Sequence, residues 1–192
     1  MTTIAAALKA WEEKTGTPPS EAKKITLYAQ MPPITKLDNS LNTLVKCEHL
    51  ALSTNSIDKF IPLGGMQSLK ILSVGRNLLK KFEKLEENAG TLTELWASYN
   101  QINTLDGLST LKNLEILYLS NNLISKWEEL EKLAENENLR DILLAGNPIA
   151  EGLAEEDFRI QVLKHMSKNT NLVKIDNKLI KPSEWEKSTT SS

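Results

Sequence analysis

The sequence predicts an α/β solenoid, a right-handed superhelix with a parallel sheet on its concave side and a helical cap at each end. The main observation is one phrase, LTELWASYNQINTL from Leu92 to Leu105, that the chain repeats with variations. The second is composition. The chain has 192 residues, of which 40% are hydrophobic and 25% charged, which suits one folded domain with a core along its whole length.

The repeated phrase has the form L-x-x-L-x-Φ-x-x-N-x-I-x-x-L, where Φ is apolar. Its copies begin at Cys47, Leu69, Leu92, Leu114 and Leu139. Each copy keeps one asparagine, and successive asparagines are 22 to 25 residues apart, a period typical of leucine-rich repeats. These asparagines are Asn55, Asn77, Asn100, Asn122 and Asn147.

The pattern of one copy predicts a short strand followed by a turn. Leu95 and Ala97 alternate with Glu94, Trp96 and Ser98, and this period of two places the first pair toward the core. The asparagine follows where the chain turns, and its side-chain amide can bond backbone groups that would otherwise be unpaired. Stacked copies should form an asparagine ladder, and stability should come from the stacking.

The chain begins with an expected cap. Residues 3–14 read as an amphipathic helix, with Thr2 or Thr3 able to cap its start and Gly16 able to end it. We expect residues 1–24 to cover the open end of the solenoid as helix and linker. Residues 25–150 should hold the repeats, of which 25–37 is a degraded first copy.

The last repeat and the C-terminus differ in composition. The return segment from Trp127 reads as a helix with Leu130 and Leu133 inward and its glutamates outward. Residues 151–181 should form a C-terminal cap with a helix over 154–167, which completes a single domain of residues 1–181. Residues 182–192 are polar and end in Ser and Thr, so we expect a disordered tail.

Charge and cysteine content limit the partners. The net charge is −2 and the pI about 5.8, which argues against a protein that binds nucleic acid or membranes through its overall charge and leaves local charged patches open. Cys47 is the only cysteine and stands at a leucine position, so we expect a buried free thiol rather than a disulfide or thiolate metal site. The chain shows no apolar run long enough for a membrane span and no signal-peptide pattern at its start.

Catalysis has little support in the sequence. His49 and His165 are the only histidines and belong to distant parts of the solenoid. No glycine-rich phosphate loop and no metal-ligand spacing is present. We therefore expect no catalytic residue, no metal and no cofactor, and a protein that is not an enzyme.

The concave face carries the main candidate site. Outward-pointing strand residues are mostly small or polar, but apolar ones gather on four adjacent strands, where their side chains should touch. An exposed apolar patch centred on Trp and Tyr is typical of a protein interface. The predicted partner-binding residues are Ile71, Ser73, Trp96, Ser98, Ile116, Tyr118 and Leu143.

Charge is also divided unevenly near the C-terminus. Residues 128–157 hold ten acids and two bases, whereas residues 158–181 hold six bases and one acid. The basic segment could contact an acidic partner through Arg159, Lys164 and Lys168, or it could be a solvated surface with self-compensating charges.

The repeat resembles the protein-phosphatase-regulator-like class of leucine-rich repeats. Other phrases are more specific: WEEKTG, SEAKKITLYAQMPPITKLD, LALSTNSIDK, LTELWASYNQI and LEILYLSNNLISKW. Together, over about residues 1–180, they resemble the leucine-rich-repeat light chain of axonemal outer-arm dynein. That resemblance implies a light chain in the cytoplasm, cytoskeleton and ciliary or flagellar axoneme, which binds a dynein heavy chain at its microtubule-binding stalk tip and regulates the motor's hold on the microtubule.

The same resemblance implies contacts through the concave sheet face and through residues 158–181, with tubulin as a further possible partner. It leaves the mechanism open between steric limitation, direct tubulin contact and a shift of the tip between weak and strong binding. We expect a monomer when isolated, with no nucleic acid and no membrane as partner. Two alternatives share the repeat consensus: an adaptor for an RNA-binding splicing protein and an adaptor for a phosphatase.

Overall fold

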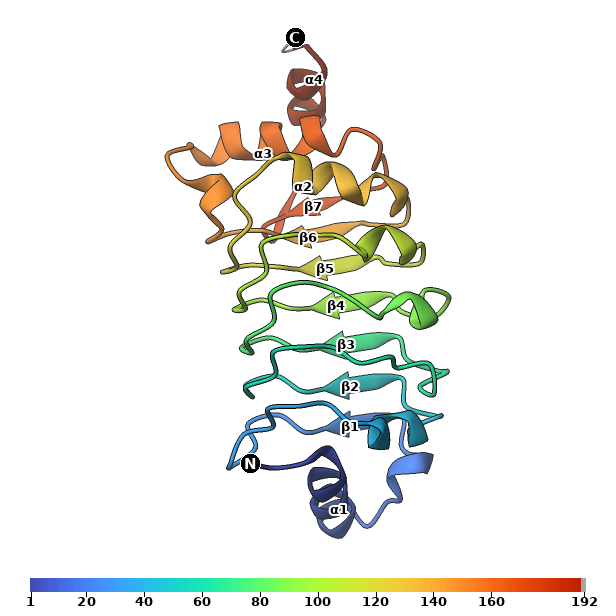
Figure 1. Ribbon diagram of the computed structural model, residues 1–192. Coiled ribbons are helices and arrows are strands. Elements are labelled where there is room, and N and C mark those ends of the chain that lie inside the picture. Colours follow the sequence, from blue (N-terminus) through green and yellow to red (C-terminus); the bar gives the residue numbers. More distant parts are fainter. Residues whose placement is uncertain (191–192) are drawn as a thin grey trace.

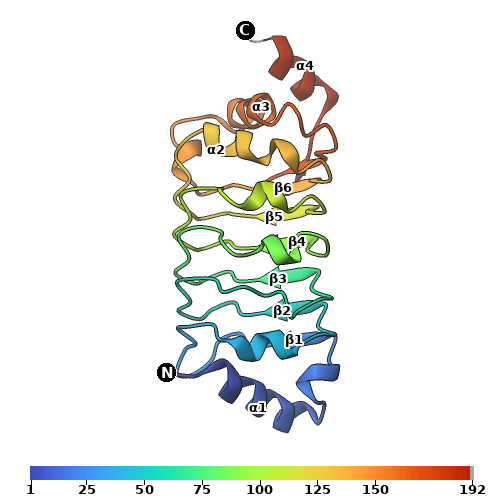
Figure 2. The ribbon, with the colours of Figure 1, turned by 45° about the vertical axis from the view of Figure 1, so that its right-hand side comes forward.

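The computed structural model describes residues 1–190 as one stack of coils with a helix at each end (Figure 1). Figure 2 shows the same column from another side, with the two termini at opposite ends. Its α-helices are α1 (Ile4–Thr15), α2 (Glu128–Glu131), α3 (Glu155–His165) and α4 (Pro182–Thr190). None of the helices in the described part is long and apolar enough to cross a membrane.

One sheet runs the length of the stack, with its strands in sequence order. Neighbouring strands are parallel from the first to the seventh, and the short β7–β8 hairpin closes the sheet in the antiparallel sense. The strands are β1 (Lys24–Thr26), β2 (His49–Ala51), β3 (Ile71–Ser73), β4 (Glu94–Trp96), β5 (Ile116–Tyr118), β6 (Asp141–Leu143), β7 (Lys174–Ile175) and β8 (Lys178–Leu179). This is the predicted leucine-rich-repeat solenoid.

The outer side of the coils is made of short 3₁₀ turns rather than long helices. These turns are Pro19–Glu21, Asn39–Thr43, Glu86–Asn88, Leu108–Thr110, Lys132–Glu135 and Pro148–Ala150. Three of them bring a leucine inward, Leu41, Leu108 and Leu133, to pack with the buried central residues of the strands. The core is therefore a continuous layer between sheet and turns.

The recurring asparagines bond neighbouring coils through their side chains. Nδ2 of Asn100 donates to the carbonyls of Val74 and Ala97, both at 3.0 Å, and Oδ1 accepts the N–H of Leu79 at 3.0 Å. Asn55, Asn77, Asn122 and Asn147 repeat this arrangement, accepting from the backbone of Ile34, Ile57, Ile102 and Ile124. The result is a ladder of hydrogen bonds along the edge where the strands end.

A second asparagine ladder, which the repeat pattern does not reveal, lies under the outer turns. Asn88, Asn136 and Asn169 are buried, and each Nδ2 donates to carbonyls of the preceding coil. Asn136 donates to Leu108 and Leu111, both at 2.8 Å. These bonds satisfy the carbonyls that the short turns leave unpaired.

The residue before each ladder asparagine is in the left-handed conformation. Thr54, Arg76, Tyr99 and Asn121 have φ between 54° and 59°, and Gly146 takes the same place in the last repeat with φ 77°. A Cβ at Gly146 would come within 2.5 Å of Oδ1 of Asn121. The tight turn therefore projects one exposed side chain per coil from this edge, at a cost of about 1 kcal/mol for each non-glycine residue.

The N-terminal cap follows the sequence. The Thr3 hydroxyl accepts the N–H of Ala6 at 3.1 Å, and Gly16, with φ 69°, ends α1. Nε1 of Trp11 donates to the Thr26 hydroxyl at 3.2 Å, which fixes the helix on the first strand.

The expectation that all glutamates of the last return segment point outward is wrong at one position. Leu130 and Leu133 are buried as predicted, but Glu129 is buried with them. Its Oε2 accepts the N–H of Leu105 at 2.8 Å, and Lys132 bonds the same carboxylate at 2.8 Å. The carboxylate accepts a backbone N–H of the preceding coil that would otherwise be unpaired, and Lys132 balances its charge, so its burial is tolerated.

The expectation of a disordered tail from residue 182 is also wrong, because α4 occupies Pro182–Thr190. The cause is a buried ion pair. Nε of Arg159 on α3 donates to Oε1 of Glu184 at 2.5 Å, and both side chains are more than nine-tenths buried. Trp185 packs against the core beside this pair. Residues 191 and 192 lie outside the described residues.

Candidate functional site: the concave face

Strand register decides which concave side chains are neighbours. Ser73, Trp96, Tyr118 and Leu143 are paired across β3 to β6 and form one row. A second row runs beside it and contains Ile71, Glu94, Ile116 and Asp141. The predicted apolar residues therefore lie on adjacent strands, but Glu94 stands between Ile71 and Ile116. We call Ile71, Trp96, Ile116, Tyr118 and Leu143 the concave patch.

The aromatic centre of the patch is held by contacts on three sides. The Trp96 and Tyr118 rings stack with centroids 6.2 Å apart and planes 23° apart. The ring of His49 meets Trp96 edge-on at 5.5 Å. Nε1 of Trp96 donates to Oε2 of Glu94 at 3.0 Å. The indole is thus oriented before any partner arrives, which lowers the entropy cost of binding.

Polar groups on either side position the two rings. Nε2 of His49 lies 3.2 Å from Oγ of Ser73, which is 4% exposed. Burial, followed by the charge of Lys24, lowers the pKa of His49, so the imidazole beside Trp96 is neutral at pH 7. His49 and Glu94 were not among the predicted partner-binding residues. Their place in the repeat, which puts their side chains on the same face of the sheet as Trp96, is the signal that could have identified them.

The C-terminal end of the patch carries an ion pair. Asp141 is 8% exposed; its Oδ2 accepts from Nζ of Lys174 at 3.1 Å and lies 3.5 Å from the Tyr118 hydroxyl. Burial raises the pKa of Tyr118, and the neighbouring Asp141 charge adds to that rise. Tyr118 is therefore a neutral hydroxyl at the rim of an apolar surface.

The other predicted residues of the face are small. Ser98 is partly exposed and lies next to Gly75 of the preceding coil, where a Cβ would come within 3.1 Å of the Ser98 carbonyl. Because Ser98 and Gly75 are small, the Trp96 and Tyr118 rings protrude from this part of the concave face. A surface of this shape suits a partner that inserts side chains around Trp96.

Comparison with known proteins identifies the family. Residues 91–132 match the model of the leucine-rich repeats (2 copies) family. Over 189 residues the chain is 50% identical to dynein axonemal light chain 1 of Chlamydomonas reinhardtii, covering 96% of this chain and 94% of the relative. It is 51% identical to the same protein of Rattus norvegicus, over 97% and 98% of the two chains.

The chain belongs to the axonemal dynein light chain 1 family. The human member is 54% identical over 160 residues, which cover 83% of this chain and 84% of that relative. The resemblance drawn from the repeat and non-repeat phrases together is thereby confirmed.

Solved structures support the fold. The Drosophila melanogaster SNF/U2A' complex contains a chain that superimposes with a TM-score of 0.66 at 22% identity, over 81% of this chain and 91% of that one. An internalin, InlF, from Listeria monocytogenes gives a TM-score of 0.53 at 20% identity, over 79% of this chain and 46% of that one. At such identities the likeness shows the solenoid alone.

The basic contact predicted for this family member needs a correction at Arg159. Its guanidinium is 4% exposed and donates to Glu184 and to the carbonyls of Ile175 and Leu179 at 2.6 and 2.9 Å. It therefore fastens the C-terminal cap and cannot meet a partner.

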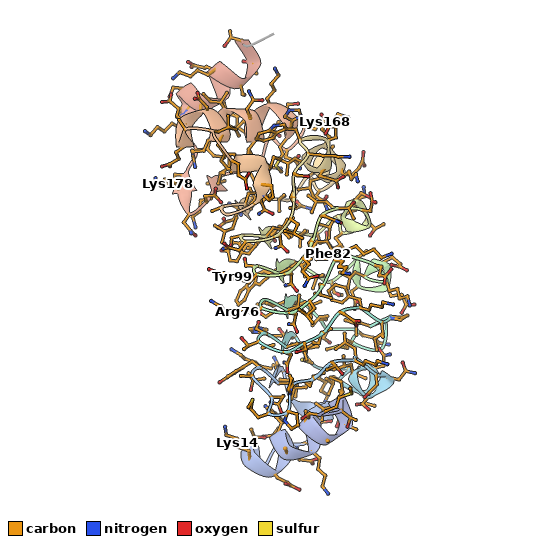
Figure 3. All side chains as sticks on the ribbon, turned by 60° about the vertical axis from the view of Figure 1, so that its left-hand side comes forward. Lys14, Arg76, Phe82, Tyr99, Lys168 and Lys178 are labelled. Carbon is orange, nitrogen blue, oxygen red and sulfur yellow. The ribbon has the colours of Figure 1, made fainter. Side chains whose placement is uncertain are left out.

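Other bases of the same segment pair within the fold. Lys174 bonds Asp141 and Lys178 bonds Glu155 at 2.5 Å. Lys168 and Lys178 lie on opposite sides of the cap in Figure 3, so the segment does not present one basic surface. Lys164 and Lys168 are exposed and stay candidates.

The Cys47 thiol and the imidazole of His165 lie in different parts of the fold. Cys47 is buried, its Sγ donates to the His49 carbonyl at 3.3 Å, and burial raises the pKa of the thiol to about 11. His165 lies on α3, stacked on Trp127 with centroids 5.3 Å apart. Within the described residues, no group of three or more His, Cys, Asp or Glu side chains could hold a metal ion.

Proposed function

We propose that this chain is a non-catalytic light chain of ciliary or flagellar outer-arm dynein, placed in the axoneme, that binds a heavy chain near its microtubule-binding stalk tip. Family membership supports the dynein assignment, because about half of the residues are identical over nearly the full length of the relatives. The buried, strongly protonated thiol of Cys47 supports a binding rather than a chemical role.

The concave patch is the proposed heavy-chain contact, and the observation that carries this assignment is the oriented aromatic pair Trp96–Tyr118. Its rings are partly exposed although they are fixed by Glu94, His49 and each other. Large side chains held in place at an exposed apolar centre are the usual anchors of protein interfaces. Ser98 lies beside this surface as a small, partly exposed neighbour, whereas Ser73 is 4% exposed and supports His49 from below rather than contacting the partner.

The proposed effect is regulation of the motor's hold on its track. A light chain bound at the stalk tip changes microtubule affinity if it binds the weak and strong states of the tip unequally. Microtubule co-sedimentation of the stalk tip with and without the light chain measures this. Different affinities are expected, and identical affinities would contradict the regulatory role.

The partner itself is tested by pull-down. The recombinant chain is immobilised and offered heavy-chain stalk-tip fragments and, as a matched control, heavy-chain tail fragments of similar size. Retention of the stalk tip alone is expected. Retention of the tail instead, or of neither fragment, would contradict the proposal.

We also propose Lys164 and Lys168 as a secondary contact for acidic groups of the heavy chain or tubulin. A Lys164→Glu/Lys168→Glu variant in the same pull-down tests it, with weaker and more salt-sensitive retention as the expected result.

The isolated light chain is proposed to be a monomer, which light scattering of the purified protein checks.

A further inference from the structure

A column of lysines runs along the stack on the side where each chain segment leaves the strand and turns outward. Lys59, Lys81 and Lys126 each stand four residues after a ladder asparagine. The first coil has no ladder asparagine, so Lys36 is placed by its isoleucine instead. Lys36 follows Ile34 by two residues, just as Lys59 follows Ile57, and the N–H of each isoleucine donates to a ladder asparagine. Equivalent positions on coils one, two, three and five are therefore occupied by Lys36, Lys59, Lys81 and Lys126.

The ladder fixes the spacing of this column. Because adjacent coils are hydrogen-bonded throughout, equivalent positions are about 4.8 Å apart, and the column spans roughly 19 Å. Thr104 takes the equivalent place on the fourth coil, and Lys80 adds a further base beside Lys81. We call Lys36, Lys59, Lys80, Lys81 and Lys126 the lysine column.

Most of these charges are not neutralised by the fold. Lys81 pairs with Glu83 at 3.0 Å, whereas Lys36, Lys59, Lys80 and Lys126 make no ion pair with any residue in the range 1–190. All four are exposed. This contrasts with the C-terminal cap, whose Lys174 and Lys178 are paired. A protein with net charge −2 thus keeps a basic column in which four of the five lysines have no ion-pair partner among residues 1–190.

An apolar and aromatic border lies beside the column at the turns. Leu78 is 43% exposed, Tyr99 47% and Leu123 50%, and they come from three successive coils. The guanidinium of Arg76 lies over the Tyr99 ring, 4.3 Å from its centroid. Figure 3 shows Arg76 and Tyr99 together on one edge of the stack. The border is separate from the concave patch, because its side chains come from the turns after the strands.

We propose that the lysine column and this border form a second docking surface, which binds a short acidic polypeptide segment that also carries apolar side chains. Charge complementarity selects an acidic partner. The length of the column matches about six residues of extended chain at roughly 3.3 Å each. Leu78 and Leu123 provide contacts for apolar side chains between the acids.

The surroundings favour a short peptide over a long polyanion. Directly after Lys126, α2 of the same coil presents Glu128 and Glu131, both exposed, which would repel a continuing phosphate backbone. The border holds one aromatic side chain, Tyr99, and its ring is already covered by Arg76, so successive bases would have no series of rings to stack on. Nucleic acid and anionic lipid are therefore outcomes of the test rather than the proposed partners.

The test is a fluorescence anisotropy titration of the full chain with a labelled twelve-residue peptide, Glu-Glu-Leu repeated four times. The comparison probes are the same peptide with Lys in place of Glu, an oligothymidylate of twelve nucleotides, and phosphatidylserine vesicles. The acidic peptide should bind, with affinity falling several-fold between about 50 and 200 mM salt. Absence of binding, or tighter binding to oligothymidylate or vesicles, would overturn the proposal.

Two variants of equal charge change locate the site. Lys59→Glu/Lys80→Glu alters the column, and Lys9→Glu/Lys14→Glu alters exposed lysines of α1. The column variant should lose about tenfold or more in peptide affinity and the control less than about threefold, while both keep the wild-type melting temperature. Equal losses in the two variants would mean that only net charge matters.

The surface is also distinguishable from the proposed heavy-chain contact. Trp96→Ala should leave peptide affinity unchanged. If Trp96→Ala removed peptide binding, the peptide would be occupying the concave patch, and the second surface would be wrong.

Discussion

Trp96 stacks on Tyr118 of the next strand, with ring centroids 6.2 Å apart, while its Nε1 donates to Glu94 on its own strand. The two contacts are independent, one apolar and one polar, and both leave part of the indole exposed. Because the core leucines lie on the other face of the sheet, this arrangement contributes little to the fold itself. It is best explained as a prepared contact for a partner.

Replacing Asn100 with Ala should destabilise the domain by about 1–3 kcal/mol. The substitution leaves the N–H of Leu79 and the carbonyls of Val74 and Ala97 without their side-chain partner. Urea unfolding measures the loss. Asn113→Ala is the matched control, since among residues 1–190 its exposed side chain bonds only the Gly90 carbonyl. Equal free energies of unfolding for the two variants would mean that the Asn100 hydrogen bonds do not stabilise the fold by this amount.

The docking of α4 should be lost at acidic pH. The Arg159 guanidinium lowers the pKa of Glu184 below its ordinary value of 4.5, so the folded state holds this carboxyl charged more strongly than the unfolded state does. The stabilisation is complete above that ordinary pKa and disappears as pH falls through the lower folded value. Hydrogen exchange of the α4 amides as a function of pH follows this loss.

Glu184→Gln is the control for that experiment. It removes the titrating group and leaves the Arg159 charge buried, so α4 should exchange faster at neutral pH and lose this acid transition. A transition that persists unchanged in the variant would assign it to another group, such as the exposed pair Glu156–Lys187.

The Cys47 thiol should react slowly in the native protein. It is buried, and its pKa is raised to about 11, so almost none of it is thiolate at pH 8. A thiol reagent such as dithionitrobenzoate should label it at a rate limited by unfolding, and quickly in urea. Rapid labelling without denaturant would show that the second coil opens locally.

The sequence was sufficient for the features that repeat. The strand and ladder positions around Asn100 recur in register, and so does the outward row that holds Trp96. It was insufficient where a contact between two residues far apart in the sequence determines whether a segment folds. The tail composition of α4 is typical of disorder, and only its contact with Arg159, 25 residues earlier in the chain, makes it a helix.

The same limit explains the other differences. Glu129 is buried because it closes the backbone at Leu105, one coil away, which no local amphipathic pattern reveals. The second ladder uses Asn88 and Asn136, which lack a regular spacing, so no periodicity marks them. The basic segment of residues 158–181 looked like one surface, but its charges are divided among several internal partners.

The most direct test of the account is the affinity of a heavy-chain stalk tip for the wild-type chain and for two aromatic variants. Trp96→Ala removes the centre of the concave patch, and Tyr28→Ala removes an exposed aromatic side chain that follows β1. We predict unchanged melting temperatures for both, an affinity loss of about 2 kcal/mol or more for Trp96→Ala, and nearly wild-type affinity for Tyr28→Ala. Wild-type affinity in a folded Trp96→Ala variant would contradict the concave patch as the heavy-chain contact.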